Sequence, residues 1–188
     1  MPSNAYTNHL VVLLEDVREL QTAHTQLRKG LAGRQWGLGS LNRASIVLTV
    51  SSWEAYLEEV VRECLEAIRP LAPPFGVWPA LNASVRGDLG RFNTPNAENA
   101  RKLFLESFGI PDITDEWHWK NCTPAQARDI LNQALTERHR IAHGVNPRPT
   151  IHNNYARWLP GVVARLAERT DEGLKRHFQK TFHITLNW

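Results

Sequence analysis

Apolar residues recur every three or four positions in two long N-terminal stretches, which is the spacing of one face of an α-helix. The first stretch covers residues 5–28 and ends before two glycines, so we expect an amphipathic helix there. The second begins at Ser40, a residue type common at helix N-caps, and stops at Pro70. Its apolar face is formed by Ile46, Val50, Trp53, Leu57, Val60, Cys64 and Ile68.

Another helix is marked at both of its ends. Thr123 suits an N-cap, Pro124 suits the first helical position, and Gln126 completes a capping box. Gly144 supplies the left-handed residue that commonly follows a helix. The apolar residues between these marks keep helical spacing; they are Ala127, Ile130, Leu131, Ala134, Leu135, Ile141 and Ala142. The pattern therefore predicts a helix from Pro124 to His143.

The segments between these helices are more polar. We interpret residues 70–79 as a rigid connector and residues 80–96 as an irregular or weakly helical loop. That loop carries side chains that would suit a phosphate or a partner, although a solvated loop is the favoured interpretation: Arg86, Arg91, Asn93 and Asn96. Asn96 also suits the N-cap of a short helix over residues 97–108, and residues 110–122 form a Trp-rich loop.

The C-terminal part continues the helical pattern. Residues 150–178 are mostly helical, with a kink or a restart expected at Pro160. Residues 181–188 alternate enough for a short strand or for a tail docked on a partner. The predicted architecture is one all-α domain over residues 1–188, a bundle of about five helices with a short C-terminal extended tail.

Composition limits the protein class only broadly. The chain has 188 residues, of which 42% are hydrophobic and 22% charged, which is ordinary for a globular domain. Two cysteines form no disulfide framework or metal-ligand spacing, so we expect a cytoplasmic protein. No run approaches the ~20 apolar residues of a membrane span, so no membrane partner is expected. The net charge of +3 permits nucleic-acid binding without demonstrating it.

Candidate chemistry lies in the last turns of the helix that ends before Gly144. At ~100° per residue, Arg138 falls near the middle of the apolar arc, close to Leu135 and Ala142. His139 and His143 are four residues apart and therefore share one flank of the helix. A buried guanidinium is costly unless it is paired or faces a wet cleft, so its position requires a reason. An arginine can donate two hydrogen bonds to a phosphate, and an imidazole can transfer protons near neutral pH.

This arrangement resembles the R-x4-6-H signature of HEPN domains, in which a polar residue commonly follows the arginine. Other segments are similar to the RiboL-PSP-HEPN branch: Ser52–Glu59, Phe104–Ile113 and Trp117–Trp119. The likeness covers roughly residues 40 to 145. It implies a metal-independent endoribonuclease without a cofactor, in which the RNA 2′-hydroxyl attacks the neighbouring phosphate and leaves a cyclic phosphate.

In that interpretation His143 acts as general base or acid, and Arg138 holds the scissile phosphate. His139 positions the substrate, and Glu54 orients Arg138. The resemblance also implies a homodimer whose two motifs share one cleft, because one His143 supplies only half of an acid–base pair. It further implies a toxin or antiviral defence effector that acts on RNA, with an antitoxin or defence protein as partner.

Three alternatives stay open on the sequence. In the first, Arg138 forms a buried pair with Glu54 and the histidines only end a helix. In the second, His139 and His143 bind a metal, although Arg140 stands where a zinc-protease helix has glutamate. In the third, the chain is a non-catalytic HEPN module that dimerises or binds nucleic acid or a partner protein. The loop Trp117–Trp119 would stack bases or, as the favoured interpretation, pack over the bundle end.

Overall fold

The chain folds into an all-α structure. The computed structural model describes residues 1–28, 37–71, 76–143 and 151–188. Six α-helices lie in this part of the chain: α1 (Val11–Leu27), α2 (Gly39–Ala67), α3 (Trp78–Leu89), α4 (Ala97–Phe108), α5 (Pro124–Ala142) and α6 (Asn153–His177). Shorter turns of π- and 3-10-helix accompany them at Ala5–Leu10, Ile113–Glu116 and Phe178–Phe182. The predicted fold class is confirmed, with one helix more than the expected five.

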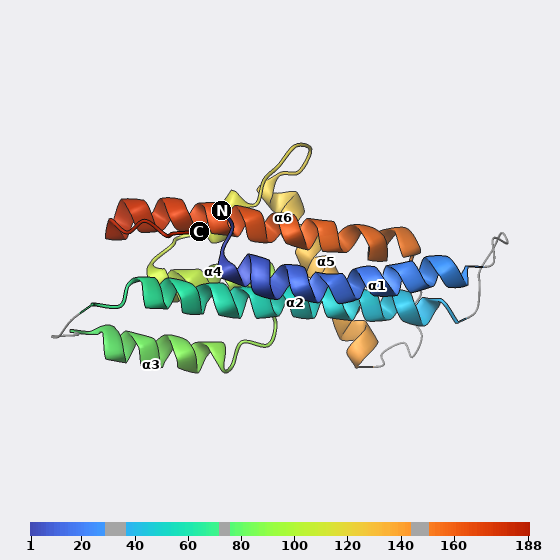
Figure 1. The fold of residues 1–188 in the computed structure, drawn as a ribbon, viewed down its shortest axis with the longest axis horizontal. Helices are drawn as coiled ribbons and strands as arrows, with labels where there is room; N and C mark the ends of the chain where they lie inside the picture. The colour runs from blue at the N-terminus through green and yellow to red at the C-terminus, as the bar shows by residue number, and fades with distance from the viewer. Residues whose placement is uncertain (29–36, 72–75, 144–150) are drawn as a thin grey trace.

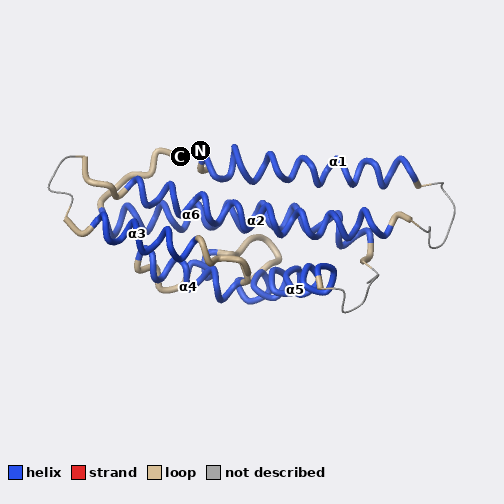
Figure 2. The backbone as a smooth tube through the Cα atoms, turned by 90° about the horizontal axis from the view of Figure 1, so that it is seen from below, coloured by secondary structure: helices blue, strands red, loops and turns tan. Residues whose placement is uncertain are grey.

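The second helix, α2, lies at the centre of the molecule. In Figure 1, α1, α2 and α6 run along the long axis, and α5 crosses behind α2. Figure 2 places α1 at one side, α2 and α6 in the middle, and α3, α4 and α5 at the other side. α2 packs against α1, α5 and α6, and its Trp53, Tyr56 and Leu57 side chains are fully buried. The core is therefore organised around α2.

The expected restart at Pro160 does not occur, because α6 runs without interruption through this residue. Proline has no backbone N–H, so the Ala156 carbonyl one turn earlier loses its helical donor. Gln21 of α1 replaces that donor, since its side-chain Nε2 donates to the Ala156 carbonyl at 3.0 Å. Contact with another helix thus satisfies the group that the proline leaves unpaired.

Two predicted helix boundaries are wrong. Ser40 is not an N-cap; α2 already begins at Gly39, and the Ser40 hydroxyl donates to the Gly37 carbonyl. Residues 80–96 are not mainly a loop, because α3 occupies Trp78–Leu89. Its apolar residues step by four positions, and the last two of them are buried: Leu81, Val85 and Leu89. This apolar stripe is short, and the asparagine, glycine and serine residues around it favour loops, so the sequence pattern did not indicate a helix.

The C-terminal tail docks on its own chain and forms no strand in the described residues. His183 adopts a left-handed conformation, with φ of 56°, and turns the chain after the π-helical turn. Leu186 is buried, and the half-buried Ile184 and Trp188 pack against the core. The Lys175 ammonium lies 5.3 Å from the centre of the Trp188 ring. The expected strand is therefore wrong, and the tail covers its own bundle.

A buried carboxylate anchors the N-terminus to the bundle. Asp171 of α6 is 2% exposed. Its Oδ2 accepts a hydrogen bond from the Ser3 N–H at 2.7 Å, and its Oδ1 accepts one from the Tyr56 hydroxyl at 2.7 Å. These bonds connect the chain terminus, α2 and α6 through one side chain.

We expect Asp171→Asn to lower the free energy of unfolding by about 1–3 kcal/mol, because one buried donor then loses its acceptor. Urea unfolding followed by circular dichroism measures this loss. The control is Glu172→Gln, which changes the exposed neighbour that pairs with Arg169 at 2.6 Å. The control should cost less than about 0.5 kcal/mol. Equal losses in the two variants would contradict the anchoring role.

Candidate functional site

α5 carries the candidate residues, and its start is held by local bonds. The predicted capping box is confirmed: Thr123 Oγ1 accepts from the Gln126 N–H at 3.3 Å, and Gln126 Oε1 accepts from the Thr123 N–H at 2.9 Å. Asn132 in the middle of α5 accepts a hydrogen bond from the N–H of Ala97, which begins α4. The helix ends at Ala142 with His143 as C-cap, while Gly144 lies outside the described residues.

Arg138 lies where the buried face of α5 ends. Leu135 and Leu131, one and two turns earlier, are buried, whereas Arg138 is half-buried and Ala142 is exposed. The prediction that the apolar arc extends to Ala142 is therefore wrong. The reason is visible in Figure 1, where the last turns of α5 emerge on the α3 side of α2 and leave the packed bundle.

Glu54 of α2 faces the same region as Arg138. It is half-buried and follows the fully buried Trp53. Burial raises the pKa of the Glu54 carboxyl, the positive charge of Arg138 opposes that rise, and the negative charge of Glu58 adds to it. Glu54 and Arg138 therefore interact electrostatically, although no ion pair within 4.0 Å joins them to each other. The expected role of Glu54, to orient Arg138, stays a prediction.

The two histidines form a contact on the surface of α5. The ring centres of His139 and His143 lie 4.2 Å apart with planes inclined by 42°, as spacing by four residues predicts. Both side chains are exposed. On a regular helix Arg138 and His143 point ~140° apart, so they leave α5 in different directions. The imidazole pair is open to a ligand, and the half-buried Arg138 leaves the helix on another side.

The chain matches one known family over most of its length. Residues 12–175 match the family model described as RiboL-PSP-HEPN, which is well over half of the chain. The chain belongs to the RiboL-PSP-HEPN family. The HEPN resemblance predicted from roughly residues 40 to 145 is therefore confirmed, and it extends toward both ends. HEPN families include ribonucleases, so nuclease chemistry lies within their range.

Searches of curated proteins and of solved structures found no match to this HEPN chain. In the described part of the chain, no helix combines the length and apolar character needed to cross a membrane. The same residues contain no group of three or more His, Cys, Asp or Glu side chains placed to hold a metal ion. His139 and His143 would therefore need ligands from elsewhere to form a metal site.

Sequence reasoning missed two residues beside the HEPN motif. Glu137 forms an ion pair with Arg140 at 2.9 Å, and the spacing of three residues was a usable signal. Tyr155 comes from α6, and its buried hydroxyl finds no hydrogen-bond partner among the described residues. Burial and the charge of Glu137 raise the pKa of Tyr155 to about 12. No spacing along the chain indicates Tyr155, because it reaches Glu137 only through the packing of α6 beside α5.

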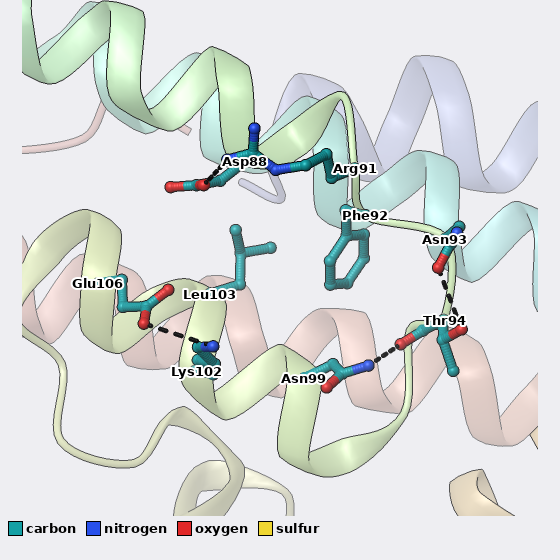
Figure 3. Close-up of a pocket in the computed structure, with 9 residues that line it drawn as sticks. All are labelled: Asp88, Arg91, Phe92, Asn93, Thr94, Asn99, Lys102, Leu103 and Glu106. Atoms are coloured by element: carbon teal, nitrogen blue, oxygen red, sulfur yellow. Dashed lines mark hydrogen bonds and ion pairs between the residues drawn. The ribbon is translucent and has the colours of Figure 1, made fainter.

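Several polar side chains of residues 80–96 bond to nearby residues. Arg91 pairs with Asp88 at 2.7 Å, and Asn96 caps α4 by accepting from the Asn99 N–H. Asp88, Arg91 and Asn99 line a hollow of about 220 Å³ between α3 and α4. Figure 3 shows this hollow, with Lys102 directed at Glu106. Its charges are mutually paired, so it offers no unpaired group for a phosphate.

Proposed function

We propose that this HEPN protein is a metal-independent endoribonuclease. The observation that carries the proposal is the exposed imidazole pair at the end of α5, next to a half-buried arginine that interacts with Glu54. These residues constitute the R-x4-H motif in a chain that belongs to a family containing ribonucleases. An arginine and an imidazole are the groups that a phosphodiester transfer requires when no metal takes part.

The reaction needs three contributions. A base removes the proton of the RNA 2′-hydroxyl, whose oxygen then forms a bond to the adjacent phosphorus. An acid gives a proton to the 5′-oxygen as its bond to phosphorus breaks, which leaves a 2′,3′-cyclic phosphate and a 5′-hydroxyl. Positive charge stabilises the phosphorane between these steps. We assign proton transfer to His143, phosphate binding to Arg138, and orientation to His139 and Glu54.

A second copy of the chain completes the proposed site. One His143 cannot be base and acid in the same step, and Arg138 leaves the helix ~140° away from it. A two-fold dimer places the same surface twice around one axis. Two imidazoles and two guanidinium groups would then share one cleft, and the two copies of His143 would divide the proton transfers.

We further propose that this nuclease acts as a toxin or an antiviral defence effector. In this reaction the 2′-hydroxyl of the RNA is the nucleophile, so cleavage requires no cofactor. A cell that contains such a nuclease must therefore restrain its activity. We therefore propose a partner protein, an antitoxin or a sensor, that covers the site until RNA cleavage is required.

The chemistry can be tested with the unaltered protein. We expect it to cleave single-stranded RNA in the presence of a chelator and to yield 2′,3′-cyclic phosphate ends, identified by mass spectrometry. A strand of the same sequence with deoxyribose throughout should remain whole, because it lacks the attacking hydroxyl. Cleavage of both strands would contradict the mechanism. Binding without cleavage would indicate a non-catalytic HEPN module, whose affinity should fall steeply with salt.

A further inference from the structure

A hollow of about 440 Å³ lies at the N-terminal half of α5, away from the motif at its other end. It is enclosed by α5, the loop before α5, and α6. Its apolar lining includes Trp119 from the loop, Ile130 from α5 and Trp158 from α6, and its polar lining includes Asn121 and Asp129. Trp158 is 50% exposed and is the only exposed aromatic side chain among the described residues. A half-exposed indole beside a hollow on a surface is typical of a binding site.

Local contacts shape the two segments that carry the indole rings. Trp119 and Cys122 exchange two backbone hydrogen bonds, at 3.1 and 2.9 Å, across a tight turn. Asn121 within that turn has φ of 64°, a left-handed conformation that asparagine tolerates. The Tyr155 ring lies beside that of Trp158, with ring centres 6.4 Å apart and planes inclined by 40°. Two indole rings at one hollow suit a flat ligand, because a base can stack on aromatic side chains.

The polar rim favours one kind of flat ligand. Asp129 is exposed and makes no hydrogen bond or ion pair with any residue that the structure describes. An ionised carboxylate is only an acceptor, so it selects a ligand edge that offers donors. Among the four RNA bases, only guanine presents two adjacent donors, N1–H and the N2 amino group, on its Watson–Crick edge. Single-stranded RNA is recognised in this way, by stacking and by bonds to that edge.

The hollow also lies on a route to the proposed catalytic residues. Asp129 and His143 are separated by roughly 21 Å along α5, with 1.5 Å per residue. Gln133 and Thr136 lie between them on the same side of the helix, and both are exposed. Lys120 adjoins Trp119, is exposed, and forms no ion pair with any described residue. A single strand could therefore lie along α5 with a base in the hollow and a phosphate at the motif.

We propose that the hollow between Trp119 and Trp158 binds a guanine base of single-stranded RNA and so positions the strand for cleavage at the motif of α5. This subsite rests on the proposed ribonuclease function, because it serves the same substrate. The indole rings stack on the base, Asp129 accepts hydrogen bonds from its N1–H and N2 amino group, and Lys120 meets the backbone. The enzyme thereby prefers cleavage sites that lie a few nucleotides from a guanine.

The test measures binding apart from cleavage. The probes are fluorescein-labelled uridine oligomers, 2′-O-methylated so that they cannot be cleaved, with one central guanine, inosine or adenine. We expect fluorescence anisotropy to show about tenfold tighter binding of the guanine probe than of the adenine probe, with inosine between them. Trp158→Ala should weaken binding of the guanine probe about tenfold. Asp129→Asn should remove the preference for guanine and retain binding of all three probes.

The controls are Asp16→Asn on α1 and Trp188→Ala in the tail, which should keep the wild-type preference. Equal affinity of the wild-type protein for the guanine and adenine probes would overturn the proposal. Unchanged binding of the guanine probe by Trp158→Ala would also overturn the proposal, because the hollow would then not hold the base. A protein that cleaves RNA without guanine preference would refute the subsite and leave the proposed function intact. A protein that binds the guanine probe preferentially but cleaves no RNA would refute the proposed function and retain the guanine site.

Discussion

Substituting alanine for His143 is expected to slow RNA cleavage by about 10²–10⁴-fold, the usual contribution of a general acid or base. The side chain is exposed at the end of α5, so the variant should retain its thermal stability. A time course of cyclic-phosphate formation measures the rate. The matched control is His118→Ala, because His118 is another exposed imidazole and lies in the loop before α5. A His143→Ala protein as fast as this control would refute the role assigned to the motif.

The same variant tests whether two chains share one site. Wild-type protein mixed with a fourfold excess of His143→Ala, and left to exchange subunits, should retain about one fifth of its activity, because most wild-type chains then have a variant partner. If the variant only competed with the wild-type protein for RNA, activity would fall as soon as the variant is added. Subunit exchange lowers activity only after incubation. The variant is therefore added either just before the assay or well ahead of it. Activity that stays unchanged after incubation would show that each chain works alone.

Replacing Trp117 by alanine is expected to lower the free energy of unfolding by about 3–5 kcal/mol. Its side chain is completely buried, its Nε1 donates to the Thr170 hydroxyl at 2.9 Å, and its ring meets that of Trp53 edge-on at 5.7 Å. Removing the ring creates a cavity between α2 and α6 and leaves the Thr170 hydroxyl without this donor. A loss of that size is a large part of the stability of an ordinary domain.

Urea unfolding followed by near-ultraviolet circular dichroism measures this loss. Trp158→Ala is the control, because the Trp158 ring is 50% exposed and should cost less than about 1 kcal/mol. A Trp117→Ala protein as stable as the control would contradict the packing role. The burial of Trp117 confirms that this ring packs in the bundle, whereas the half-buried Trp119 remains accessible at the hollow.

The helices with clear end signals could be predicted from the sequence, because those signals act within a few residues. Thr123, Pro124 and Gln126 mark the start of α5 by bonds that close inside one turn. Asn96 and Gly109 mark α4 in the same way, by a side-chain cap and a left-handed residue with φ of 69°. The contact between His139 and His143 is equally local, since it follows from the pitch of the helix.

Elements that depend on distant partners could not be predicted. α3 carries only a short apolar stripe, and its burial against the rest of the bundle decides that it is helical. Pro160 predicts a kink or a restart, yet α6 runs through it, and Gln21 of α1 donates to the carbonyl that the proline leaves unpaired. The C-terminal tail alternates like a strand, but no neighbouring strand exists in the described residues to pair with it. Packing of its apolar side chains on the core determines its path instead.

By itself, the sequence determined the all-α class, the ends of α4, the start of α5, the HEPN family and the presence of a guanidinium and two imidazoles at the end of one helix. Periodicity, caps and motif spacing are properties of short stretches, so no knowledge of the fold is needed to recognise them. Only the tertiary structure decided that the charge of Arg138 acts on Glu54, that the charge of Glu137 acts on Tyr155, and that Trp119 and Trp158 line one hollow. These pairs join different segments of the chain, and their distances depend on how whole helices pack.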